Sequence, residues 1–88
     1  MDMNLTDKSV SQIAGIIRAD WTQGGKKVYF GAVPYLDAMR SMDKVTDDYF
    51  ADSGPSVIRY FLANATTWKG EVARAVKAEL NKRIKGVY

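Results

Sequence analysis

The chain has 88 residues, a net charge of +3 at pH 7, and neither cysteine nor histidine. This length gives room for one small core and excludes a second domain. The two missing residue types exclude disulfides, thiol nucleophiles, Ser-His-Asp triads and the common cysteine or histidine metal sites. We therefore expect a non-enzymatic protein that acts by binding a macromolecule and uses no metal or cofactor.

The first predicted helix lies between Thr6 and the pair Gly24–Gly25. Its apolar residues recur at spacings of three and four, which is typical of one helical face: Val10, Ile13, Ala14, Ile17 and Trp21. Thr6 is the expected N-cap, with Leu5 able to pack on Val10, and the double glycine ends the helix. Residues 1–5 are expected to fray. Residues 1–8 lack the positive start and the apolar run of a secretion signal, which predicts a cytoplasmic location.

Residues 26–33 combine aromatic and β-branched side chains, a composition typical of either a strand or an ordered loop. We favour the loop, because a strand here has no candidate partner except residues 48–51. A short helix is expected next, with Pro34 in its first turn and four residues pointing inward: Tyr35, Leu36, Met39 and Met42. Residues 43–54 are polar and poor in helix formers, which predicts a surface loop.

Two further helices are predicted in the second half of the chain. Ser53-Gly54-Pro55 is typical of a helix start, and the apolar residues behind it cover one face: Val57, Ile58, Phe61, Leu62 and Ala65. Residues 64–67 interrupt this helix, and either Thr66 or Thr67 can cap a last helix from about Trp68 to about Lys85. Together the elements predict an all-α fold, in which residues 1–88 form one compact bundle of three longer helices and one shorter helix, with an aromatic loop between the first two.

Charge is distributed unevenly along the chain. Residues 69–88 contain six basic and two acidic residues, a net +4, whereas residues 37–52 carry a net −3. One face of the last helix bears a basic row that could follow phosphates, and the same charges are also typical of a solvated helix face near its C-terminus. The candidate nucleic-acid contacts are Lys26, Lys27, Arg74, Lys77, Lys82, Arg83 and Lys85.

Aromatic rings and the acidic segment form the second candidate site. Such rings fill cores, anchor protein partners or stack on bases. The candidate protein-binding residues are Tyr29, Phe30, Tyr35, Tyr49, Asp47, Asp48 and Asp52. An exposed, contiguous patch formed by Tyr29, Phe30, Ile16 and Tyr49 would favour a protein interface.

Three stretches carry a resemblance to known proteins. Residues 29–39 (YFGAVPYLDAM), 52–54 (DSG) and 61–74 (FLANATTWKGEVAR) resemble small proteins encoded by phages, prophages and other mobile elements, and the resemblance extends from Trp21 to about Lys82. It implies an accessory protein that acts in a bacterial host cell by binding a macromolecule, with inhibition of a host defence enzyme, of the anti-CRISPR or anti-restriction type, as an expected role. The net positive charge counts against simple imitation of DNA.

These observations predict the kind of partner. We expect a protein partner first and a nucleic acid as the alternative, with no membrane association. The sequence leaves monomer and homodimer open.

Overall fold

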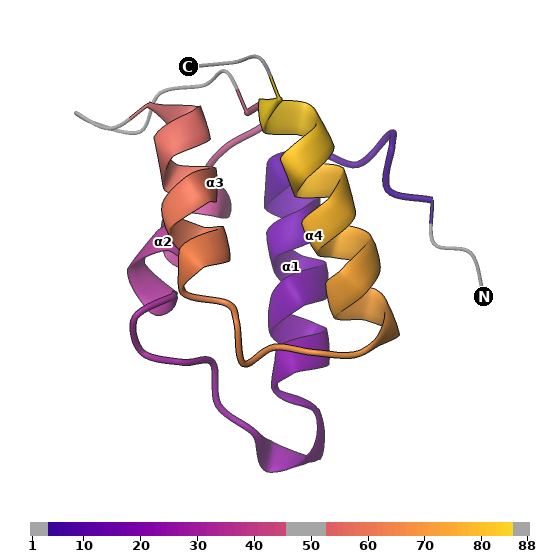
Figure 1. Ribbon diagram of the computed structural model, residues 1–88, viewed down its shortest axis with the longest axis vertical. Coiled ribbons are helices and arrows are strands. Elements are labelled where there is room, and N and C mark those ends of the chain that lie inside the picture. The colour runs from indigo at the N-terminus through magenta and orange to yellow at the C-terminus, as the bar shows by residue number, and fades with distance from the viewer. Residues whose placement is uncertain (1–3, 46–52, 86–88) are drawn as a thin grey trace.

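Four α-helices make up the described part of the chain, residues 4–45 and 53–85, in a computed structural model (Figure 1). They are α1 (Val10–Trp21), α2 (Val33–Met39), α3 (Gly54–Ala63) and α4 (Glu71–Ile84), and a single 3-10 turn, η1 (Gln23–Gly25), follows α1. Helix α1 packs against α4 and α2, and α3 packs against α2 and α4. The predicted all-α bundle of three longer helices and one shorter helix is confirmed.

Helix α1 contributes the stripe that the sequence predicts. All five of its stripe residues are buried, but the N-cap is Ser9 and the prediction of Thr6 is wrong. The Gln12 backbone N–H donates to Ser9 Oγ at 3.1 Å, and the Ser9 N–H donates to Gln12 Oε1 at 2.8 Å. This reciprocal capping box satisfies two backbone donors at once, which a lone Thr6 hydroxyl could not do.

The segment before α1 is held against the bundle. Leu5 is only 3% exposed and belongs to the core, and the Arg83 guanidinium of α4 donates to the Leu5 carbonyl oxygen at 2.6 Å. The prediction that residues 1–5 fray therefore does not hold for Leu5, while residues 1–3 lie outside the described residues.

The connection from α1 to α2 is an ordered loop, as predicted. Gly24 and Gly25 take positive φ angles of 70° and 82°, a region that favours glycine. Residues 26–33 contain no strand. Instead, the Ala32 N–H donates to the Tyr29 carbonyl at 2.9 Å and forms a turn that leads into α2.

Helix α3 begins as the sequence predicts, whereas α4 begins later. Ser53 Oγ accepts a hydrogen bond from the Ser56 N–H at 3.3 Å, which caps α3. Helix α4 starts at Glu71 and not at Trp68, and its N-cap is Gly70, with φ 116°, so the predicted threonine cap is wrong. Trp68 instead lies in the segment between α3 and α4 and holds that segment against α1, because its ring stacks on the Trp21 ring with centroids 5.6 Å apart.

Candidate interaction surface

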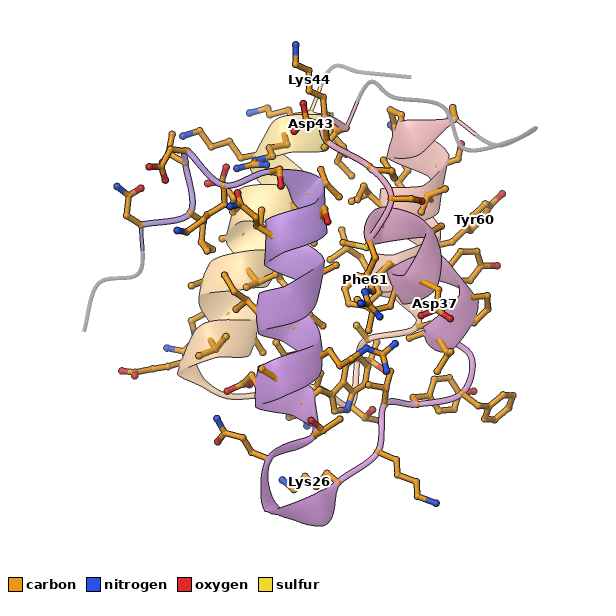
Figure 2. The ribbon with its side chains drawn as sticks, turned by 180° about the vertical axis from the view of Figure 1, so that it is seen from behind. Lys26, Asp37, Asp43, Lys44, Tyr60 and Phe61 are labelled. Atoms are coloured by element: carbon orange, nitrogen blue, oxygen red, sulfur yellow. The ribbon has the colours of Figure 1, made fainter. Side chains whose placement is uncertain are left out.

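The exposed large apolar side chains of the described residues are all aromatic. Phe30 is 78% exposed, Tyr60 52% and Tyr29 44%. Figure 2 shows Tyr60 projecting outward from α3, whereas its neighbour Phe61 points into the bundle. Tyr29 and Phe30 contact each other with ring centroids 4.8 Å apart, and Tyr60 contacts the half-buried Tyr35 of α2 at 5.4 Å. We call these four residues the aromatic face.

The end of α3 links the two ring pairs. A Cβ added at Gly31 would lie 2.6 Å from Tyr29 Cε2 and 2.7 Å from Asn64 Oδ1, so the Tyr29 ring and the Asn64 side chain both crowd against Gly31. The Asn64 Nδ2 group in turn donates to the Tyr60 carbonyl oxygen at 2.8 Å. The turn that carries Tyr29 and Phe30 therefore meets the C-terminal end of α3, the helix whose Tyr60 ring contacts Tyr35 of α2.

Two basic residues precede the aromatic face in the chain. Lys26 and Lys27 are the only charged residues between Trp21 and Leu36, and both are exposed. Two carboxylates flank this segment. Asp37 Oδ1 pairs with Arg18 Nη2 at 2.9 Å, whereas Asp20 Oδ2 accepts the Trp68 indole N–H at 2.9 Å and lines a hollow of about 190 Å³ together with Lys26 and Lys69.

The predicted protein-binding residues divide into two groups. Tyr29, Phe30 and Tyr35 come together on the aromatic face, whereas four others lie outside the described residues: Tyr49, Asp47, Asp48 and Asp52. Ile16 is partly buried against the core, and because Tyr49 lies outside the described residues, the patch of Tyr29, Phe30, Ile16 and Tyr49 stays a prediction.

Sequence reasoning missed Tyr60. On a helical wheel it lies beside the buried stripe of α3, about 100° from Phe61. The sequence did contain an indication of its exposure, because Tyr60 is a large aromatic residue outside the predicted apolar stripe of α3.

Two of the predicted nucleic-acid contacts serve the protein itself. Lys77 Nζ donates to the Trp68 carbonyl at 2.6 Å and lies 5.9 Å from the Trp68 ring centroid. Burial, followed by the nearby charge of Lys69, lowers the pKa of Lys77 below its ordinary value of 10.5. Arg83 donates to the carbonyls of Leu5 and Thr6 and, through Nε, to Glu79 Oε2 at 2.7 Å. The remaining basic candidates are exposed: Lys26, Lys27, Arg74, Lys82 and Lys85.

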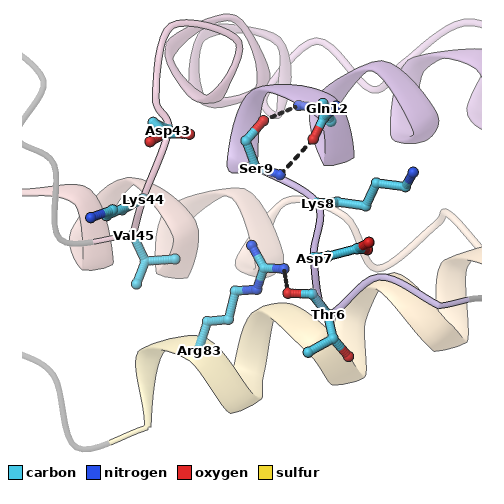
Figure 3. A pocket seen from close by; sticks show the side chains of 9 residues that line it. All are labelled: Thr6, Asp7, Lys8, Ser9, Gln12, Asp43, Lys44, Val45 and Arg83. Carbon is cyan, nitrogen blue, oxygen red and sulfur yellow. Dashed lines mark hydrogen bonds between the residues drawn. The ribbon is translucent and has the colours of Figure 1, made fainter.

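Two hollows lie away from the aromatic face. One, of about 430 Å³, lies between the segment before α1 and residues 43–45 (Figure 3). Its side chains carry charges of both signs, and Ser9 and Gln12 are occupied with capping. The second, of about 330 Å³, lies at the start of α4 and includes three basic residues: Lys69, Arg74 and Lys77.

Neither hollow assembles a recognisable catalytic group. Within residues 4–45 and 53–85, no three metal-binding side chains gather at one place. No helix in this part of the chain has the length and apolar character needed to cross a membrane.

Comparisons with known proteins identify no family and no relative of this chain. No protein-family model matches the chain, and neither the curated proteins nor the solved structures compared with it gave a match. The function has to be argued from the side chains described above.

Proposed function

We propose that the protein is a non-catalytic binding module that recognises another protein through its aromatic face. The observation that carries this proposal is the exposure of Phe30, Tyr60 and Tyr29 on one surface, in a chain that buries both of its tryptophans. Aromatic residues dominate the few positions that supply most of the free energy of protein binding. Phe30, 78% exposed, has the largest ring surface left to bury.

On the strength of the resemblance to small phage and mobile-element proteins, the proposed partner is a protein of a bacterial host cell. Inhibition of a host defence enzyme is the role that this proposal favours. Binding without catalysis fits a chain that lacks histidine and cysteine, because those residues supply the commonest general bases and thiol nucleophiles.

Affinity capture tests this proposal with a matched control. Wild-type protein, the double variant Phe30→Ala/Tyr60→Ala and the control Lys82→Ala are immobilised and exposed to lysate of a bacterium that carries the gene. We expect one protein to be captured in a stoichiometric amount by the wild type and the control, and to be lost from the double variant. Equal capture by all three would exclude the aromatic face, and no capture by the wild type would contradict protein binding altogether.

The alternative is nucleic-acid binding by the basic C-terminal helix. The geometry favours it less, because Lys77 and Arg83 make hydrogen bonds within the protein. It rests on the exposed charges of Arg74, Lys82 and Lys85. If the alternative holds, affinity for duplex DNA falls steeply with salt, and reversing these three charges abolishes binding. The proposal of a protein partner predicts no such binding.

A further inference from the structure

We propose that the surface recognised by the aromatic face is acidic as well as apolar. This inference rests on the proposed function and adds the chemistry of the partner. It begins from two exposed charges that come just before the aromatic face in the chain, Lys26 and Lys27, three and two residues before Tyr29. Neither lysine forms an ion pair within residues 4–45 and 53–85.

The neighbouring carboxylates leave an excess of positive charge. Asp37 pairs with Arg18, and Asp20, which accepts a hydrogen bond from the Trp68 indole N–H, shares a hollow with two lysines, Lys26 and Lys69. Within the aromatic loop and its turn, from Lys26 to Leu36, the charge is therefore purely positive. A partner whose acidic side chains surround an apolar centre complements this layout, and such complementarity speeds association and rejects other partners.

A second copy of the chain fits the aromatic face less well. A two-fold contact places the same surface of both copies together, so a contact centred on Phe30 would bring the Lys26 and Lys27 side chains of both copies to the same interface. Facing like charges are unfavourable there.

A nucleic acid also fits less well. Bases stack on open ring faces, but the rings of Tyr35 and Tyr60 lean against each other with an interplanar angle of 37°. Phe30, which contacts Tyr29 at 53°, is the only one of the four rings that is largely open to solvent. Tyr29 also lies against Gly31. An acidic protein surface is the occupant that these contacts favour.

A displayed library of random peptides tests the inference. Peptides are selected on the wild-type protein and counter-selected on Phe30→Ala/Tyr60→Ala. We expect the survivors to combine aromatic or aliphatic residues with aspartate and glutamate. The tightest peptide is then synthesised, and its Kd is measured with the wild type, with Lys26→Glu/Lys27→Glu, and with the matched control Lys82→Glu/Lys85→Glu.

The expected result is a Kd about tenfold weaker for Lys26→Glu/Lys27→Glu, and a change within about twofold for the control, because exposed charge pairs contribute modestly and locally. Added salt should weaken wild-type binding and have little effect on the variant. Circular dichroism should show that both variants keep their helices.

The other outcomes separate the two proposals. If no selected peptide depends on Phe30 and Tyr60, the proposed function fails. If peptides depend on these rings but carry no excess of acidic residues, or bind Lys26→Glu/Lys27→Glu as tightly as the wild type, the inference fails and the proposed function stands. A dimer that Phe30→Ala/Tyr60→Ala dissolves, or single-stranded DNA binding that it removes, would overturn the inference in favour of those occupants.

Discussion

Replacing Arg83 by alanine separates a structural role from a role in binding phosphate. Its guanidinium donates to the Leu5 carbonyl at 2.6 Å and to the Thr6 carbonyl at 3.3 Å, and it pairs with Glu79 at 2.7 Å (Figure 3 shows the bond to Thr6). The two charged side chains are largely buried, with 17% of Arg83 and 14% of Glu79 exposed. Arg83→Ala would leave the Glu79 carboxylate without its ion-pair partner and would free the segment before α1.

The loss of stability in Arg83→Ala can be estimated from these contacts. A hydrogen bond to a charged group contributes about 1.5 to 3 kcal/mol, and Arg83 makes two short ones. Partial exposure moves each toward the lower end of that range, so we expect the free energy of unfolding to fall by about 3 kcal/mol. For a small domain with a urea m-value of about 1 kcal/mol/M, the midpoint of unfolding falls by about 3 M.

Urea unfolding followed by circular dichroism measures this loss, with Arg74→Ala as the control on the same helix. Arg74 is exposed, so its replacement should change stability by less than about 0.5 kcal/mol. Hydrogen exchange at Lys8, whose N–H donates to the Leu5 carbonyl, should accelerate in Arg83→Ala alone. Equal midpoints for the two variants would refute the structural role of Arg83.

Three further predictions concern the cap, the core and pH. Ser9→Ala should lower stability by about 1 kcal/mol in urea unfolding, whereas Thr6→Ala should change it little, because Ser9 caps α1; the reverse order would contradict the capping box. Phe61→Ala should cost about 3 to 5 kcal/mol in thermal or urea unfolding, while Phe30→Ala should stay within about 0.5 kcal/mol, because Phe61 is fully buried and Phe30 is exposed; similar losses would contradict this placement. The pKa of Lys77 is lowered in the folded state, so between that lowered pKa and 10.5 the unfolded chain binds more protons at this group than the folded chain does. Across this pH range the free energy of unfolding of the wild type should therefore rise with pH relative to that of Lys77→Met. A stability difference that stays constant with pH would contradict the pKa shift.

Sequence periodicity is enough to predict the four helices and most of their buried faces. In α1, the spacing of Val10, Ile13 and Ile17 identified the core stripe, and in α3 the group Ser53-Gly54-Pro55 marked the helix start. These features are local, because helical hydrogen bonds join residues four apart and caps act within one turn. Local periodicity is therefore enough to predict them.

Side chains that connect distant segments have roles that the sequence pattern does not predict. The last apolar stripe predicted a helix from Trp68, but Trp68 stacks on Trp21, 47 positions earlier in the chain, and α4 begins at Glu71. Arg83 is one of several basic residues in the sequence, yet it alone among the predicted phosphate contacts reaches the carbonyls of Leu5 and Thr6.

The same holds for the aromatic face. Tyr29 and Phe30 were candidates from their loop, but their exposure and their connection to Tyr60 depend on how the turn at Gly31 meets Asn64 at the end of α3. A linear pattern records which residues share a helical face. Which ring stays in water depends on the packing of elements that are far apart in the chain, because burial is a property of the assembled neighbours and not of the segment.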